Sequence, residues 1–508
     1  MEKRALLAVL LSVVAVVVWY GLFPPSPTPL ATQEIAEPVK RTPEEGSLPP
    51  ERQAVREGPR EKIFGSQEET ITFQGEGFRA VVSNRGGVLR SWSLLKYRDE
   101  KGERQELLRG GVAPLSLEPA GPWNEDLWQV IREKGAVILR WADGEGQWLE
   151  KRLEVAGEYG LRITLRALGL PGNVGMVVSS GLATWNSGGK RQALARADFV
   201  GMAREKLRRV GVGKGEEEIL GQGLRFLGAE DQYFLFVMVP EGSVTGKLQG
   251  SESVAVVEGR EAVAGLLLGL PKEHELLKSF NQGLEETLSF GLFGFFSVLF
   301  LGVLRWIHGW SGNWGVGIIV LTAGIRLLLF PLTHKSTVAM RRMGKLGPKI
   351  KAIQERYQEK AKKDPAARQR MNQEIMELYR REGVNPMGGC LPMLVQIPIL
   401  WALYALFAFA IELRHQPFIL WIRDLSAKDP TYITPILMTA SMVVQQRLAP
   451  QTGDPAQRRM FMVLPFVFGF MFMNFPSGLV LYWLVNNLLT IGQQLLTEWL
   501  LRGESKER

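Results

Sequence analysis

The stretch that decides the fold reads GNWGVGIIVLTAGIRLLLFPLTHKS and occupies residues 312–336. From Trp314 to Leu332 it contains 19 consecutive residues, and Arg326 is the only charged side chain among them. An apolar helix of about 20 residues is long enough to cross the hydrocarbon core of a bilayer. A charge inside such a helix costs at least about 2.5 to 3.5 kcal/mol unless water or a partner reaches it. The stretch therefore predicts a transmembrane helix with a functional arginine inside it.

The loop that follows this helix is strongly basic. Residues 334–384 contain 7 Lys and 7 Arg against 6 Asp and Glu, which gives +8 of the chain's net charge of +9. Loops rich in Lys and Arg stay on the cytoplasmic side of a membrane. Apolar residues recur at spacings of three and four on both sides of Asp364-Pro365, and a proline ends a helix. We therefore expect a cytoplasmic helical hairpin over 336–382; a solvated linker is the alternative.

Further apolar segments surround this region, and their flanking charges predict which way they cross. An apolar run behind Lys3 and Arg4 predicts an anchor at 1–23, with a cleaved signal peptide as the alternative. Residues 272–310 are expected to form amphipathic helices at the outer interface, because a crossing there would put the most basic loop outside. The result is an α-helical six-span bundle, consisting of the anchor and a five-span core at 311–499. The spans of the core are expected at 314–332, 389–411, 431–448, 460–475 and 479–499.

This arrangement of spans places the rest of the chain. The N-terminus and the tail at 500–508 lie in the cytoplasm, and the segment between the first two spans lies outside. Residues 24–60 are rich in proline, which predicts an extended linker. Residues 61–271 show the alternation of half-buried strands, for example at Ile71 and Phe73 and at Leu161, Ile163 and Leu165. We expect a large all-β sandwich there.

The composition excludes several classes of function. The chain has one cysteine, Cys390, and four scattered histidines, none of them within residues 62–271. One thiol cannot form an internal disulfide or a cysteine metal cluster, and the histidines are too scattered to indicate a metal site. The glycine-rich segments at 211–215 and 242–248 lack the spacing of a phosphate loop. We therefore expect neither an enzyme nor a cofactor, and the basic loop beside apolar spans indicates anionic lipid rather than nucleic acid.

Polar side chains recur inside the predicted spans. Thr322 lies one helical turn before Arg326. The last span carries a stripe at spacings of four, three and four, and the fourth span holds two adjacent glutamines near its inner end; these residues are Trp483, Asn487, Thr490, Gln494, Gln445 and Gln446. No carboxylate lies well inside a span, so we expect water rather than an ion pair around Arg326. The pattern predicts a wet cavity open to the cytoplasm; the alternative is that the amides only join helices.

Four ordered segments carry a family resemblance: residues 312–336, NPMGGCLPMLVQIPILWALY from Asn385, PFILWIRDLSAKDP from Pro417 and SGLVLYWLVNNLLTIGQQ from Ser477. They resemble the YidC family of bacterial membrane-protein insertases and cover most of residues 270–499. SNRGGVLRSWSLLKY from Ser83 and DQYFLFVMVP from Asp231 look like the periplasmic domain of its Gram-negative members, which is a β-supersandwich similar to sugar-binding enzymes.

The resemblance implies an inner-membrane protein that inserts transmembrane segments of nascent proteins, with or without the Sec translocon, through a hydrophilic groove. It implies that Arg326, Thr322, one of the two glutamines and Trp483 line this groove, and that the hairpin meets substrates or targeting partners. The implied partners are nascent membrane proteins, the lipid bilayer, the Sec translocon, the ribosome and the signal recognition particle receptor. The rival functions are a solute transporter and a membrane-anchored periplasmic carbohydrate-binding protein.

Overall fold

The structure is a computed structural model that describes residues 60–108, 110–186, 198–212, 215–221, 223–250, 254–384, 391–448 and 455–504. The chain divides into two compact units, one built of strands and one built of helices. The expected anchor at 1–23, the linker up to residue 59, Cys390 and the last four residues lie outside the described residues.

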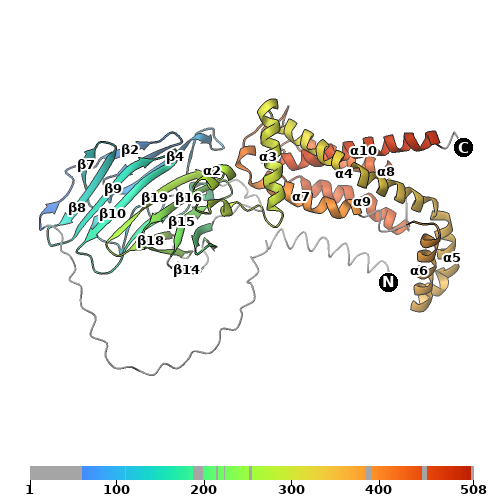
Figure 1. Cartoon of the computed structure of the whole chain (residues 1–508), viewed down its shortest axis with the longest axis horizontal. Coiled ribbons are helices and arrows are strands. Elements are labelled where there is room, and N and C mark those ends of the chain that lie inside the picture. Colours follow the sequence, from blue (N-terminus) through green and yellow to red (C-terminus); the bar gives the residue numbers. More distant parts are fainter. Residues whose placement is uncertain are drawn as a thin grey trace, which may run out of the picture. The chain divides into compact units, whose positions relative to one another are not determined.

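In the described residues, the first unit is built of three antiparallel sheets of ten, five and four strands (Figure 1). The largest sheet has the order β1 (Lys62–Ile63), β8 (Ala136–Asp143), β9 (Trp148–Ala156), β10 (Gly160–Leu168), β19 (Ala262–Pro271), β16 (Phe234–Glu241), β15 (Leu224–Glu230), β12 (Asp198–Ala203) and β13 (Lys206–Gly211), and β7 (Gln129–Glu133) pairs with β8. The second has the order β14 (Glu217–Leu220), β17 (Thr245–Gln249), β18 (Val254–Gly259), β11 (Val174–Ser179) and β6 (Leu117–Glu118). The third has the order β2 (Thr70–Gln74), β3 (Phe78–Ser83), β4 (Val88–Arg98) and β5 (Arg104–Glu106). The prediction of an all-β domain is confirmed.

Aromatic side chains join the four-stranded sheet to the ten-stranded one. Trp92 of β4 is fully buried, stacks on Phe78 with ring centres 4.3 Å apart, and meets Phe236 of β16 edge-on at 5.4 Å. Gly269 of β19 lies against the same indole, where a Cβ atom would come within 2.2 Å of the ring nitrogen. A side chain at position 269 would therefore push the two sheets apart.

A buried cation connects three parts of this unit. The Lys151 side chain on β9 is fully buried, and its ammonium donates hydrogen bonds to the carbonyls of Gly86, Gly87 and Leu115 at 2.8 to 3.0 Å. The ammonium also lies 4.4 Å from the ring centre of Trp128, which is a cation–π contact. Gly86 and Gly87 both have positive φ and lie in the turn between β3 and β4. Burial lowers the pKa of Lys151 from 10.5 to about 7.

The remaining elements are helical. α2 (His274–Ser279) and η3 (Leu284–Thr287) follow the last strand in the sequence. The second unit then contains α3 (Gly294–Ser311), α4 (Trp314–Lys345), α5 (Gly347–Lys363), α6 (Pro365–Arg381), α7 (Leu391–Phe409), η5 (Ile411–Leu413), α8 (Ile433–Leu448), α9 (Pro455–Phe472) and α10 (Ser477–Glu504). Its core is apolar and includes one buried residue from each of five helices: Leu304, Ile318, Leu406, Met438 and Leu479. Two further 3-10 turns, η1 (Pro122–Asn124) and η2 (Ala183–Asn186), belong to the first unit.

Not all of these helices have the length and composition of a membrane span. Of the described residues, α4 and the Ser477–Thr497 part of α10 are long and apolar enough to cross a membrane. Val395–Phe409 of α7 and Met462–Phe472 of α9 are apolar, and the first side chains of both helices lie outside the described residues. The chain thus combines an all-β domain with a helical region that contains apolar helices, and the count of six spans stays a prediction.

The α4 helix continues well beyond the span expected at 314–332. It begins at the Asn313 cap, whose side chain accepts a hydrogen bond from the Val316 amide, and runs across Pro331 to Lys345. A proline removes one backbone donor, but helices in membranes tolerate this when nearby side chains bond the affected turn. Two residues after the proline, the Thr333 hydroxyl hydrogen-bonds the carbonyls of Leu329 and Phe330. The first arm of the expected hairpin at 336–382 is therefore divided between the end of α4 and α5.

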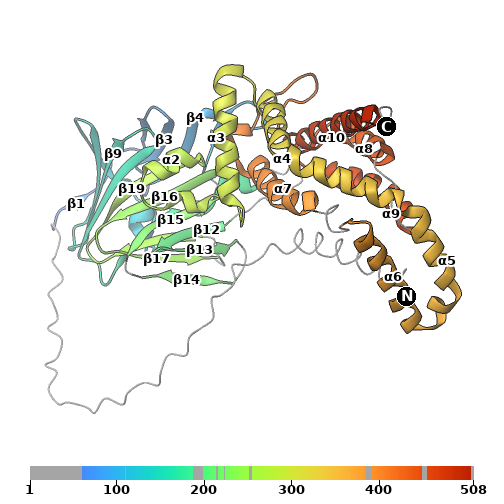
Figure 2. The same cartoon turned by 45° about the vertical axis from the view of Figure 1, so that its right-hand side comes forward.

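The α5 and α6 helices lie side by side (Figures 1 and 2). They meet at Asp364, whose side chain accepts a hydrogen bond from the Ala366 amide and so caps α6. Ion pairs join the two arms at Lys349–Glu382 (2.5 Å) and Arg356–Glu374 (2.7 Å). The sequence therefore forms a helical hairpin that turns at the expected Asp364-Pro365 break.

Candidate functional site

The candidate site is centred on Arg326, which lies halfway along α4 and is half-buried. Its Nε donates a hydrogen bond to the Asn486 side-chain oxygen at 2.8 Å. One terminal nitrogen, Nη2, donates to the Asn486 carbonyl at 3.4 Å and to the Thr490 hydroxyl. All three bonds run from α4 to α10. The sequence led us to expect water rather than an ion pair around Arg326, and the last helix supplies an amide, a carbonyl and a hydroxyl to it as well.

No carboxylate pairs with Arg326 anywhere in the described ranges. Arg305, by contrast, pairs with Glu412 of η5. A guanidinium has five N–H donors. Nη1 of Arg326 has no hydrogen-bond partner among the described residues, so its donors remain for water or a ligand.

The stripe predicted on the last span does not face one partner. Thr490 contacts Arg326 as expected, but Asn487 is buried and donates to the Ser441 hydroxyl of α8 at 3.0 Å. Its neighbour Asn486 takes the place next to Arg326. Successive residues of a helix point about 100° apart, so two adjacent asparagines face two different helices. Asn487 therefore joins α10 to α8 and is not hydrogen-bonded to Arg326.

The two ends of the stripe have different surroundings. Trp483 is half-buried beside the α9 rings of Phe468 and Phe472, with centres 6.2 and 5.2 Å away. At the other end, the Oε1 atom of Gln494 is buried and has no hydrogen-bond partner among the described residues. Gln493 beside it donates to the Thr333 hydroxyl of α4 at 2.8 Å. Polar contacts between α10 and α4 therefore extend from Asn486 to Gln493.

Among the described residues, neither Thr322 nor the two glutamines form a hydrogen bond with Arg326. Thr322 is buried, and its hydroxyl donates to the Ile318 carbonyl of its own helix at 2.6 Å. Gln445 and Gln446 are both half-buried near the end of α8, and neither makes a hydrogen bond within the described residues. The structure thus leaves open which glutamine belongs to the site.

Sequence reasoning missed a polar contact between α7 and α10. The Tyr482 hydroxyl of α10 accepts a hydrogen bond from Gln396 of α7. Tyr482 stands next to Trp483 in the sequence, and Gln396 is a polar residue in an otherwise apolar helix, so both carried a signal. The hydrogen-bond partners of Arg326 itself are uncharged, and all of them belong to α10.

Comparison with known proteins places this arrangement in a family. Residues 306–503 match the family described as 60Kd inner membrane protein. A membrane protein insertase YidC of Geobacter metallireducens is 35% identical over 97% of this chain and 98% of its own length. The YidC of Oleidesulfovibrio alaskensis is 35% identical over 99% of both chains. The chain belongs to the YidC family of membrane protein insertases.

Membership of the YidC family answers the question of function class. The chain is a membrane protein insertase of the inner membrane and not an enzyme. A crystal structure of an active YidC insertase with its first transmembrane domain resolved is also similar, at 18% identity over 97% of this chain, with a TM-score of 0.37. The near full-length sequence matches, rather than this low score, carry the assignment. Groups of three or more His, Cys, Asp or Glu that could hold a metal ion do not occur in the described part of the chain.

Proposed function

We propose that this insertase receives the polar outer segment of a nascent transmembrane protein at Arg326, in a hydrophilic groove open to the cytoplasm and to lipid. The observation that supports this proposal is the unequal use of the guanidinium. Arg326 is fixed to α10 through Nε and Nη2, whereas Nη1 has no partner among the described residues. A fixed cation with unused donors attracts carboxylates and carbonyls, and the polar outer segment of a substrate carries both.

The neighbouring residues extend this groove. Thr322, Thr490, Trp483 and the glutamine pair Gln445 and Gln446 are its proposed lining, and Asn486 joins the set as the residue that orients Arg326. Gln494 adds a buried oxygen without a partner at the cytoplasmic end of the stripe. Asn487 has its own partner on α8 and is not included.

Short spans would reduce the distance that a polar segment must cross. The α8 helix has 16 residues, and the span expected at 460–475 is of the same length, just below the about 17 to 25 residues of an ordinary span. Short spans are accommodated by local thinning of the bilayer. Once the polar segment has passed, the substrate helix moves into lipid, and partitioning provides about 0.3 to 0.6 kcal/mol for each central Leu, Ile or Phe. No nucleotide hydrolysis is needed.

The proposed topology has six spans with both termini in the cytoplasm and the β unit in the periplasm. It is supported by the charge bias of the loops and by α3, which buries Leu304 and Ile307 but exposes Trp306 and Trp310, as an interfacial helix does. Nascent membrane proteins are the proposed substrates. The Sec translocon, the ribosome and the signal recognition particle receptor are proposed partners for the cytoplasmic face, without direct contact to nucleic acid.

Cysteine labelling tests the topology. In a Cys390→Ser background, cysteines at the exposed positions Ser66 and Lys428 should react with an impermeant reagent from outside, and one at Gln369 only from inside. Ser336, Ser426 and Ser477 are buried and unsuitable as labelling positions. External labelling at position 369 would overturn the six-span arrangement.

Photocrosslinking in proteoliposomes tests the groove. A photoreactive residue at Trp483 should crosslink to a stalled nascent chain during insertion of a single-span substrate. The matched control is Leu488, which lies on the same helix and is 54% exposed. We expect the control to crosslink to lipid. Equal crosslinking of substrate from both positions would show that the substrate does not follow the groove.

A further inference from the structure

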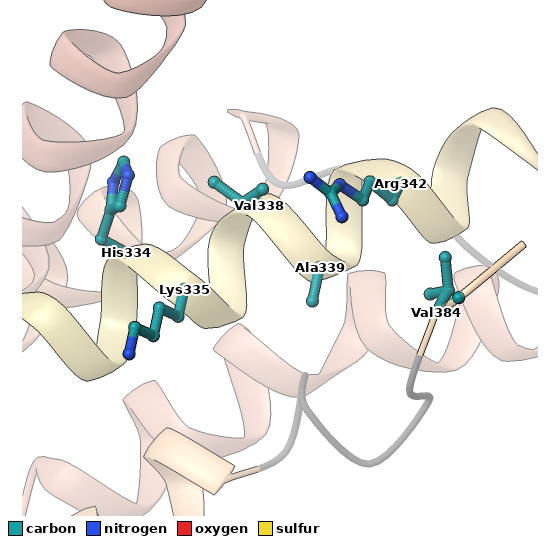
Figure 3. Close-up of a pocket in the computed structure, with 7 residues that line it drawn as sticks. His334, Lys335, Val338, Ala339, Arg342 and Val384 are labelled. Atoms are coloured by element: carbon teal, nitrogen blue, oxygen red, sulfur yellow. The ribbon is translucent and has the colours of Figure 1, made fainter.

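A pocket of about 300 Å³ lies where the end of α4 meets the end of α6 (Figure 3). Five residues of α4 and the two that follow Glu382 line it: His334, Lys335, Val338, Ala339, Arg342, Gly383 and Val384. Along α4, Lys335 lies toward one end of the pocket and Arg342 toward the other, and Val338 and Ala339 lie between them. None of the seven lining residues is acidic. The pocket is therefore a small, partly apolar depression with a positive charge at each end.

The turn after α6 forms one wall of this pocket. Gly383 has a φ of +63°, and its amide donates to the Arg380 carbonyl at 3.1 Å. The Val384 amide donates to the Tyr379 carbonyl at 2.9 Å. These two bonds form the Schellman motif that ends a helix at a left-handed glycine. The motif holds Val384 beside α4 without help from a side chain, so this wall is set by the backbone.

The two cations of the pocket lack the partners that nearby cations have. Lys349, Arg356 and Arg381 each pair with a glutamate of the hairpin at 2.5 to 2.7 Å. Lys335 and Arg342 form no ion pair with any of the described residues, and both are exposed. On the α4 side of the pocket, the Nδ1 atom of His334 is buried and also lacks a hydrogen-bond partner among the described residues. These donors remain available to an external anion.

The same face of α4 changes from apolar to basic. Leu328, Lys335 and Arg342 are seven residues apart, which keeps them on one side of the helix. Leu328 is 78% exposed, and Leu327 beside it is 76% exposed. Lys335 lies about 10 Å further along the helix than Leu328, at 1.5 Å per residue. An exposed apolar surface followed by cations fits a phospholipid, whose acyl chains would lie along the leucines and whose phosphate would reach the pocket.

We propose that this pocket binds the headgroup of an anionic phospholipid of the cytoplasmic leaflet. Lys335 and Arg342 would contact its phosphate and Val338 and Ala339 its glycerol. The phosphate of such a headgroup is a diester, and free inorganic phosphate partly imitates it. The exposed leucines favour the lipid as its source. This proposal does not depend on the route of the substrate, so it can fail while the groove proposal stands.

Native mass spectrometry of the full chain in detergent tests the proposal with phosphatidylglycerol, phosphatidylcholine and inorganic phosphate as separate ligands. The double variant Lys335→Gln and Arg342→Gln should weaken phosphatidylglycerol binding about 30-fold, since each cation near an anionic lipid contributes about 1 kcal/mol. The control Lys351→Gln and Arg356→Gln removes the same charge from α5 and should bind as the unmodified chain does. Ala339→Trp fills the pocket, keeps the charge and should also weaken binding.

Three results would contradict the proposal. Equal losses in the two double variants would mean diffuse attraction to the basic hairpin. Equal binding of phosphatidylglycerol and phosphatidylcholine would mean that charge is not recognised. Binding of inorganic phosphate as tight as that of phosphatidylglycerol would make this a small-anion site. A photoreactive phosphatidylglycerol added to the unmodified chain needs no variant: its label should map to residues 334–342, and a label found only elsewhere would exclude the pocket.

Discussion

Lys151 in the β unit and Arg326 in the helical unit both lack a carboxylate partner among the described residues, yet their surroundings differ. Lys151 is fully buried, and its three ammonium donors meet three backbone carbonyls. Arg326 is half-buried and uses Nε and Nη2 on one neighbouring helix, while Nη1 has no partner among the described residues. All three donors of the Lys151 ammonium are hydrogen-bonded, whereas Arg326 keeps donors on Nη1 that no described residue accepts.

This difference separates a structural cation from one that is available for binding. A buried polar group stabilises a fold when all its bonds are made, and it costs free energy when one is missing. Lys151 meets that condition and joins three segments of backbone. Arg326 does not meet it, because its orientation is fixed while part of its binding capacity remains. We therefore expect substitutions of Lys151 to change stability and substitutions around Arg326 to change insertion.

The largest effect is expected from Lys151→Met. The substitution keeps most of the apolar stem but leaves three buried carbonyls without donors, and each such loss costs about 1 to 3 kcal/mol. We expect the β unit to lose about 3 kcal/mol or more of its free energy of unfolding, measured in the full chain by pulse proteolysis across a urea series. Lys134→Met, at an exposed turn, is the control and should change stability by less than about 0.5 kcal/mol. Equal stability of the two variants would remove Lys151 from its structural role.

The stability of the β unit should also depend on pH through Lys151. Its pKa is lowered to about 7 in the folded protein, against 10.5 ordinarily, because burial disfavours the charged form. Between these values the unfolded chain binds a proton that the folded chain has lost, so the stability rises with pH across this window. The rise is at most about 5 kcal/mol, at about 1.4 kcal/mol per pH unit. Pulse proteolysis at pH 7 and pH 9.5 measures this rise in the free energy of unfolding. The part of the rise that comes from Lys151 should be absent in the Lys151→Met variant. An identical pH response in both proteins would contradict the assignment.

A smaller effect is expected from Asn486→Ala, with Asn487→Ala as its neighbour and control. Each substitution removes a side-chain hydrogen bond between helices, worth about 0.6 kcal/mol on average, so the two should lower thermal stability similarly. Only Asn486 orients Arg326, so only Asn486→Ala should reduce the insertion rate, by a few fold, in proteoliposomes. If both variants insert substrate equally well, the contact between Asn486 and Arg326 has no role in function.

Much of this fold follows from the periodicity of the sequence. The alternation around Ile71 and Ile163 predicted strands because each strand buries one face, and Asp364-Pro365 predicted a helix end because proline cannot continue one. The burial of Lys151 could not be predicted in this way. Its three partners lie 36 to 65 residues away in the sequence and come together only in the folded domain.

The candidate site shows the same limit. The apolar setting of Arg326 and the polar face of the last span were visible in the sequence, and Thr490 of that face accepts a hydrogen bond from Arg326. The choice between Asn486 and Asn487 was not visible, because α10 packs between α4 and α8 and each helix takes one of the two amides. Which of two adjacent residues faces which neighbour depends on the packing of three helices and not on the spacing within one.

The central claim is that Arg326 serves substrates rather than the fold, and Arg326→Ala tests it most directly. Thermal stability in detergent is measured beside insertion of one substrate with either acidic or neutral outer residues, and Arg326→Lys serves as the charge-preserving comparison. We expect the Ala variant to stay folded, because an incompletely satisfied intramembrane charge is removed, and to insert the acidic substrate about tenfold more slowly, a change of about 1.4 kcal/mol. Insertion of the neutral substrate should change less, and the Lys variant should retain much of the activity. An early-melting Ala variant in which both substrates decline equally would show instead that Arg326 mainly holds α4 to α10.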